Sequence, residues 1–456
     1  MTLIFLQSNV KKEAREFLKL AIPLASAEVA QAATSFVDTL MMGWLGRENL
    51  AAGGLASMTF FMVLATTTGV VAGVSPLVAE AYGAGQQYRV GQIARQGLWL
   101  TLVLAIPMML LMKHIDVIMY QLGQVKNTIA LSKTYLDVML WGIFPVVGFA
   151  VLRNVAAALS QARPVMVIVI GGTLFNAVNN YILGFGKFGF PRMELAGLAL
   201  ASILSQWCMF LALLIYMLKN KQIREYKIFR KIHQLELPIL WQLTRIGLPV
   251  GISSSFEIGL FTVVSYLMGM LGTDVLAAHQ IILAMEFLIF TVLLGMSYAT
   301  TIRVAQWNGQ NNCEAVRQVL YISIFLGTVF MSVITLMLLT HPRQVIGLYL
   351  DIHSPENANV LMLATPMLNI AGVVQILDGV QKTTQGALQG LKDTRTPMLL
   401  SLLSFWGVGL TVGYFLGFRF ALGGIGLWLG QSIGVAISAG FFILRFRKLT
   451  SKPSLI

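Results

Sequence analysis

Long apolar stretches separated by short polar breaks run along the whole chain. A helix needs roughly 20 apolar residues to cross a bilayer, and reading the chain at that length predicts spans near 17–43, 52–79, 92–112, 129–150, 164–185, 196–218, 240–270, 276–305, 316–340, 358–388, 397–418 and 424–444. Because a helix satisfies its own backbone hydrogen bonds in lipid, this pattern predicts an all-α membrane protein with twelve transmembrane helices.

The composition agrees with this prediction. Of the 456 residues, 57% are hydrophobic and only 11% are charged. A soluble protein of this size needs more polar groups than that to cover its surface. We therefore expect the lipid bilayer, rather than water, to surround most of the chain.

The two halves of the chain also resemble each other. Matches recur in order along both halves: a shift of 226 positions lays Pro23 on Pro249, Gly43 on Gly269 and Gly69 on Gly295, and a slightly different shift lays Arg95-Gln96 on Arg317-Gln318. Since each half holds six spans, both halves enter the membrane from the same side. We expect two six-helix lobes related by a parallel pseudo-two-fold axis along the membrane normal.

This repeat gives a domain assignment. Residues 1–218 form the predicted N-lobe, residues 219–238 a basic cytoplasmic linker, and residues 239–456 the predicted C-lobe. A cleft between two such lobes can open to either side of the membrane, which is the architecture of transport by alternating access.

The formal net charge of +13 raises the alternative of a nucleic-acid partner. The basic residues, however, lie in short clusters between apolar stretches, as the positive-inside rule requires. No basic patch with interleaved aromatic residues lies outside the spans, so we expect no nucleic-acid binding. The linker and both chain ends carry these clusters, which predicts that both termini are cytoplasmic.

Acidic residues inside the spans are the first candidates for function. They are Glu28, Asp38, Asp137, Glu257, Glu286 and Asp378. Ionisable groups at this depth are costly to bury and mark functional sites by default. Basic residues look nearly absent at comparable depth, so we expect these carboxylates to lack internal cationic partners. They would then bind a proton, Na⁺ or a cationic solute, and competition for one carboxylate gives antiport.

Polar side chains accompany three of these regions at helical spacing. Ser253 and Ser254 lie one turn before Glu257, Gln375 and Gln381 flank Asp378, and Asn176 and Asn180 lie one turn apart. The alternative explanation is that such groups join helices by hydrogen bonds, and for the amides both explanations stand equal. For Asp38, Glu257 and Asp378 we favour function, because a carboxylate is costlier to bury than an amide.

The chain contains no pattern typical of an enzyme. It has no phosphate-binding glycine-rich loop, no nucleophile elbow and no HExxH motif, and Cys208 and Cys313 lack metal-ligand spacing. We therefore expect no enzymatic activity and no cofactor. Without a nucleotide-binding motif, the energy has to come from an ion gradient or from a partner protein.

Three motifs carry a resemblance to a known family. Ser35-Phe36-Val37-Asp38-Thr39 with Gly43, Ala277-Ala278-His279-Gln280, and Gln385-Gly386-Ala387-Leu388-Gln389-Gly390 resemble the multidrug and toxic compound extrusion family, in its NorM-like bacterial branch. The resemblance covers almost the whole chain. It implies an exporter of antibiotics and amphipathic cationic small molecules, in the bacterial inner membrane, by antiport with Na⁺ or H⁺. We expect a monomer.

The resemblance also implies roles for particular residues. Asp38, with Asn176 and Asn180, looks like the proton or substrate site of the N-lobe. Glu257 and Asp378 look like the cation site of the C-lobe, able to hold Na⁺. The accessory candidates are Gln280, Gln375, Glu28 and Glu286, of which the acids Glu28 and Glu286 depart from the family's pattern. A tyrosine expected one turn before Asp378 is replaced by Val374, which leaves the choice between Na⁺ and H⁺ open.

Two other functions remain as alternatives. A lipid-linked precursor flippase with the same two lobes would need several cationic residues at membrane depth to hold a pyrophosphate. A scaffold or receptor that transports nothing would need no buried acids in duplicated lobes.

Overall fold

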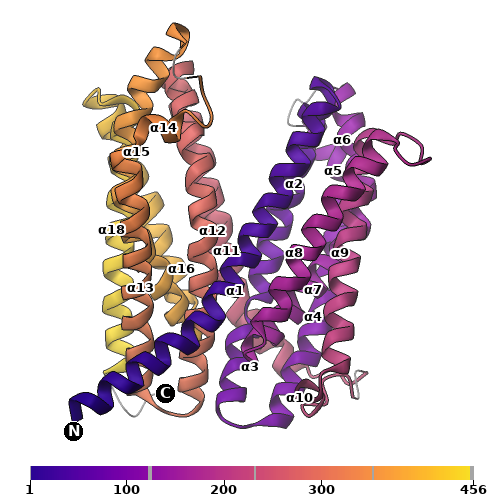
Figure 1. Ribbon diagram of the computed structural model, residues 1–456, viewed down its shortest axis with the longest axis vertical. Coiled ribbons are helices and arrows are strands. Elements are labelled where there is room, and N and C mark those ends of the chain that lie inside the picture. The colour runs from indigo at the N-terminus through magenta and orange to yellow at the C-terminus, as the bar shows by residue number, and fades with distance from the viewer. Residues whose placement is uncertain (1, 122–125, 231–232, 352–353, 452–456) are drawn as a thin grey trace. The chain divides into compact units, whose positions relative to one another are not determined.

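The computed structural model describes residues 2–121, 126–230, 233–351 and 354–451. Within these residues twelve helices are long and apolar enough to cross a membrane, which confirms the predicted all-α membrane fold (Figure 1). They cover Val10–Trp44, Arg47–Gly83, Gln87–Lys113, Thr128–Ala158, Ala162–Gly184, Glu194–Lys219, Leu237–Leu271, Thr273–Gly309, Cys313–Thr340, Pro355–Gly390, Arg395–Arg419 and Gly423–Thr450. Each agrees with one predicted span, and most of the ends extend further by a few residues.

Several spans consist of more than one helical segment. The first half of the chain contains α1 (Thr2–Trp44), α2 (Arg47–Val71), α3 (Val74–Gly83), α4 (Gln87–Lys113), α5 (Ile115–Gln121), α6 (Lys126–Met139), α7 (Ile143–Ala158), α8 (Ala162–Asn179), α9 (Glu194–Lys219) and α10 (Lys221–Arg224). The second half contains α11 (Leu237–Leu271), α12 (Thr273–Gly309), α13 (Cys313–Thr340), α14 (Pro342–Ile346), α15 (Ala358–Gly390), α16 (Arg395–Leu402), α17 (Thr411–Tyr414) and α18 (Gly423–Thr450). Wider π-helical turns extend α8 at Asn180–Gly184 and interrupt the eleventh span at Leu403–Leu410 and Phe415–Arg419.

Contacts divide the chain into two compact units. One is Ser26–Gly251, and the other joins Ile252–Ile456 with Met1–Ala25. Both divisions fall inside a continuous helix, α1 or α11, two residues after Pro23 or Pro249. Proline removes a backbone hydrogen bond from the helix interior. Each long helix therefore passes from one unit to the other close to an interruption of its backbone hydrogen bonding. The lobe boundaries assigned from the sequence, residues 1–218 and 239–456, remain a prediction.

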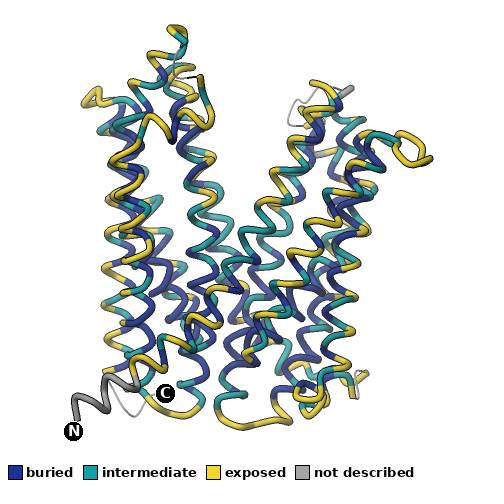
Figure 2. The backbone as a smooth tube through the Cα atoms, viewed as in Figure 1, coloured by how far each residue is buried: buried dark blue, intermediate teal, exposed yellow. Residues whose placement is uncertain are grey.

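In the unit Ser26–Gly251, glycines bring two backbones into direct contact. A Cβ atom on Gly247 of α11 would lie 1.7 Å from the carbonyl oxygen of Val70 in α2, and one on Gly69 would lie 2.4 Å from the Cα of Gly251. Small residues at a membrane helix interface allow this close approach. In the same unit, α9 lies against α6, α7 and α8. The helix faces that contact neighbouring helices are buried (Figure 2).

In the other unit, α15 lies against α12, α13 and α18. Hydroxyl groups of α12 donate across the contact to backbone carbonyls of α15: Ser297 to Lys382 at 2.9 Å, and Thr301 to Gly386 at 2.8 Å. A Cβ atom on Gly386 would lie 2.4 Å from the Ser297 carbonyl oxygen. The C-terminal part of α15 is therefore held closely against α12.

An arginine–glutamine pair fixes the segment that follows the sixth span. Arg95 of α4 donates to the carbonyl of Arg230 at 2.9 Å, and the Gln96 amide donates to the carbonyl of Gln234 at 2.9 Å. The Gln96 side-chain oxygen accepts from the backbone N–H of Glu236 at 3.1 Å. The basic linker is thus tied to the start of α4 before α11 begins.

The repeat places an equivalent arginine in the second half, and that arginine has an equivalent partner. Arg317, near the start of α13, donates to the carbonyl of Thr450 at the end of α18. In both halves, an arginine of the third span therefore binds the backbone that follows or ends the sixth span. The sequence match between Arg95 and Arg317 corresponds to a matched structural role.

We predict that Gly247→Ala lowers the free energy of unfolding by at least about 2 kcal/mol, because the new methyl group overlaps the Val70 carbonyl. Thermal unfolding of the purified protein in detergent measures the change. Gly54→Ala is the matched control, since its Cβ would meet no atom within 4 Å and alanine favours a helix. Equal melting temperatures for the two variants would contradict the close contact.

Candidate functional site

Asp38 lies in α1 at the centre of a hydrogen-bonded polar group. The Asn180 amide donates to one carboxylate oxygen at 2.5 Å, and the Ser202 hydroxyl donates to the other at 3.3 Å. Asn176 joins both neighbours: it accepts from Asn180 at 3.0 Å and donates to Ser202 at 3.2 Å. The structure therefore brings Asp38, Asn176 and Asn180 together, as the sequence predicts.

The local fold explains this geometry. α8 ends at Asn179 and continues as the π-helical turn that starts at Asn180, and such turns are frequent at functional sites. Asn176, Asn180 and Ser202 are all buried, while Asp38 is half-buried. No lysine or arginine among the described residues forms an ion pair with Asp38, so its negative charge is balanced only by neutral donors. Ser202 was missed from the sequence, because one serine in an apolar helix gives no signal.

Glu28 has a cationic partner, which corrects the expectation for the spans. Arg153 of α7 donates to the Glu28 carboxylate at 2.6 Å, and the two side chains are 14% and 12% exposed. Glu28 and Asp38 both belong to α1, yet only Asp38 lacks a paired cation. We interpret the Glu28–Arg153 pair as a structural link between α1 and α7 within this unit.

Glu257 also has a partner that the sequence analysis missed. Lys382 of α15 donates to the Glu257 carboxylate at 2.7 Å, with side-chain exposures of 8% and 18%. Arg303 of α12 likewise pairs with Glu13. The expectation that basic residues are nearly absent at depth is therefore wrong. The signal was readable, since Lys382 follows Asp378 by one helical turn inside a predicted span.

The remaining acids of this unit lie near the same pair. The Gln375 amide of α15 donates to the Glu286 carboxylate of α12 at 3.2 Å. Glu286 interacts electrostatically with Asp378, and Asp378 in turn with Lys382 and Glu257. The structure thus gathers Glu257, Glu286, Gln375 and Asp378 from three helices, α11, α12 and α15. We call these four residues with Lys382 the acid cluster.

The acid cluster does not converge on one ion. Across the described part of the chain, no three Asp, Glu, His or Cys side chains lie close enough to hold a single metal ion. Gln280 is exposed on α12 and donates no hydrogen bond to the acid cluster among the residues described. With every group ionised, three carboxylates face one ammonium, so the acid cluster carries an excess of negative charge.

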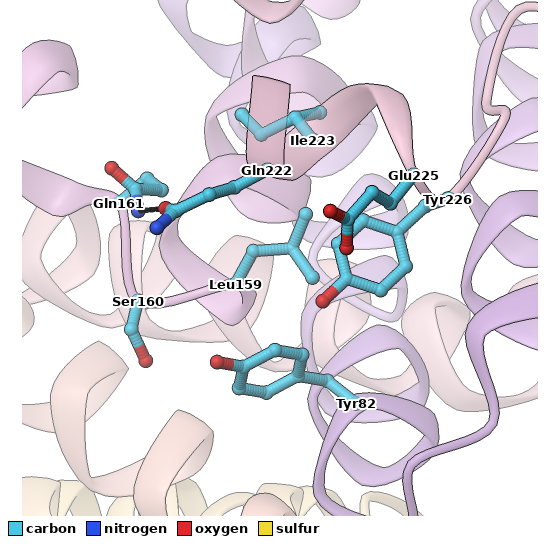
Figure 3. A pocket seen from close by; sticks show the side chains of 8 residues that line it. All are labelled: Tyr82, Leu159, Ser160, Gln161, Gln222, Ile223, Glu225 and Tyr226. Atoms are coloured by element: carbon cyan, nitrogen blue, oxygen red, sulfur yellow. Dashed lines mark hydrogen bonds between the residues drawn. The ribbon is translucent and has the colours of Figure 1, made fainter. Parts of the chain in front are cut away.

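A separate pocket of about 280 Å³ lies where the linker meets the turn between α7 and α8 (Figure 3). The rings of Tyr82 and Tyr226 meet edge to face at 6.3 Å between their centroids, and Gln161 donates to Gln222 at 3.1 Å. Burial raises the pKa of the Tyr226 hydroxyl, and Tyr82 and Glu225 add to the rise. None of the residues predicted from the sequence lines this pocket.

Comparison with known proteins decides the family. The MatE family model matches residues 23–182 and residues 249–415. The chain belongs to the MatE family, the multidrug and toxic compound extrusion transporters. The two matched segments begin 226 positions apart, at Pro23 and Pro249, which is the offset of the internal repeat.

Relatives and solved structures of MatE proteins agree along the full length. A probable multidrug resistance protein NorM of Synechocystis is 51% identical over 449 residues, covering 98% of this chain and 97% of that protein. The multidrug resistance protein NorM of Burkholderia vietnamiensis is 35% identical, covering 97% and 96%. A MATE transporter of Vibrio cholerae has the same fold, with a TM-score of 0.89 at 18% identity over 98% and 99% of the two chains. The resemblance to NorM-like proteins is confirmed.

We predict that Glu28→Gln destabilises the protein by roughly 2 kcal/mol or more, because Arg153 then remains buried beside a neutral amide. The double variant Glu28→Gln/Arg153→Gln should recover most of this loss. Thermal unfolding of both variants measures the effect. A double variant as unstable as the single one would show that the ion pair is not what Glu28 contributes.

Proposed function

We propose that this MATE-family membrane protein is a secondary active exporter of small organic cations, antibiotics among them, driven by the inward movement of H⁺ or Na⁺. The observation that carries the proposal is the Asp38 site: a carboxylate inside a membrane helix, bonded to Asn180 and Ser202 and paired with no cation among the described residues. Such a group binds a positive charge readily and releases it when another takes its place. The printed names of the relatives, multidrug resistance proteins, agree with this function.

In the proposed cycle, Asp38 alternates between a proton and the cationic solute, and Asn176 and Asn180 hold its carboxylate in place. Both partners cannot occupy one carboxylate together, so binding of one releases the other. Alternating exposure of the site to the two membrane sides then couples inward ion flow to outward solute flow.

The second unit supplies a second site for positive charge. The sequence assigns Glu257 and Asp378 to it, with Glu286 and Gln375 as accessories. Of these, Asp378 and Glu286 have no ion-pair partner among the described residues, whereas Glu257 is already paired with Lys382. We propose that Asp378 is the principal exchanging acid of this unit.

The proposed setting is the bacterial inner membrane, with both termini cytoplasmic and the protein acting as a monomer. The basic clusters of the linker and the chain ends support this orientation. The flippase alternative is not favoured, because Arg153, Arg303 and Lys382, among the described residues, are each paired with a carboxylate.

We predict that Asp38→Asn and Asp378→Asn each reduce gradient-driven export of a fluorescent organic cation more than about tenfold, because an amide cannot exchange a charge. Transport into everted vesicles or proteoliposomes measures the rate. Asp274→Asn is the matched control: Asp274 is exposed in the first turn of α12, and its variant should export normally. Undiminished export by both site variants would refute the assignment.

A further inference from the structure

The ammonium group of Lys382 has three favourable neighbours. Its ammonium group donates to Glu257 at 2.7 Å, lies 3.4 Å from the side-chain oxygen of Gln385, and sits 4.9 Å from the centre of the Phe290 ring. An ammonium has three donors, and an aromatic face attracts the remaining positive charge. This ammonium is therefore coordinated much as a bound cation would be.

The backbone of Lys382 is also fixed in position. The Lys382 carbonyl accepts a hydrogen bond from the Ser297 hydroxyl at 2.9 Å, in the part of α15 that lies directly against α12 at Gly386. A group held this way competes for Glu257 at a high effective concentration, unlike a free ion. Removing it from Glu257 would break a buried ion pair, which is unfavourable.

Na⁺ would therefore have to share the Glu257 carboxylate with the ammonium group of Lys382. The acids that remain are Asp378 and Glu286, which interact with each other electrostatically. Na⁺ is a hard cation that requires several oxygen ligands at once, and the ammonium of Lys382 beside Glu257 repels a second cation there. A proton requires only one carboxylate oxygen. With Glu257 occupied, the acid cluster favours a proton over Na⁺.

We propose that Lys382 is a tethered counter-ion that closes Glu257 to Na⁺ and restricts ion exchange in this unit to protons at Asp378 and Glu286. This rests on the proposed function as a cation-coupled exporter, and it selects between the two coupling ions that the sequence left open. It gives Glu286 a role in exchange and Lys382 a role in ion specificity, in which neither solute nor coupling ion touches Lys382.

The test uses the full-length protein in proteoliposomes, loaded with a fluorescent organic cation, with a pH gradient and a Na⁺ gradient imposed separately. The wild-type protein should respond to the pH gradient alone. Lys382→Met removes the charge with a side chain of similar length, so Glu257 becomes available. Transport driven by the Na⁺ gradient should then rise about tenfold or more over wild type, and Na⁺ should raise the melting temperature of this variant only.

Three further variants separate the charge effect from a packing effect. Lys382→Gln, made in parallel, should gain the same Na⁺ response. Lys382→Arg keeps a cation beside Glu257 and should stay insensitive to Na⁺. Lys382→Met/Glu257→Gln removes both charges, so the Na⁺ response should disappear again.

A fourth variant tests the role of Glu286 in proton exchange. Glu286→Gln should slow pH-driven transport by about tenfold while leaving Na⁺ without effect.

The results also distinguish this inference from the proposed function. Wild-type transport driven by the Na⁺ gradient alone would overturn the role of Lys382 and leave cation-coupled export intact. The same holds if both neutral lysine variants remain insensitive to Na⁺. Failure of the wild-type protein to transport under either gradient would contradict the proposed function itself.

Discussion

The charge of a side chain in a membrane helix has to be compensated by groups of the protein, because lipid offers neither an opposite charge nor hydrogen bonds. This chain meets that constraint in two ways. Glu28 and Glu257 are paired with Arg153 and Lys382 at hydrogen-bonding distance. Asp38, in contrast, is surrounded by neutral donors. The first arrangement holds helices together, whereas the second leaves a negative charge available to a mobile cation.

The same division between fixed and exchangeable charge organises the two units. Among the described residues, each unit contains at least one ion pair that joins helices and at least one acid that no lysine or arginine pairs with. Each unit also contains a direct contact between backbones, at Gly247 against Val70 in one unit and at Gly386 against Ser297 in the other.

The repeat extends this symmetry to the ends of each unit. Arg95 and Arg317 bind the backbone after or at the end of the sixth and twelfth spans, and Pro23 and Pro249 stand just before the points where α1 and α11 change units. Matching positions therefore perform matching structural tasks. The acids do not follow this rule, since Asp38 has a neutral environment and the acid cluster contains a lysine.

The sequence by itself determined the helical membrane fold, the twelve spans, the repeat and the family, because hydrophobic periodicity and motif order are properties of the chain read in one dimension. It also singled out Asp38, as an acid inside an apolar span, and Asn176 with Asn180, which lie one turn apart on a helix and share a face. The family resemblance, rather than this spacing, assigned the three to one site. Only the tertiary structure decided which acids are already neutralised. Lys382 and Glu257 are 125 positions apart, as are Arg153 and Glu28, and Ser202 reaches Asp38 from another helix. Such pairings depend on how helices pack, and no local pattern encodes which face of one helix will meet which face of another.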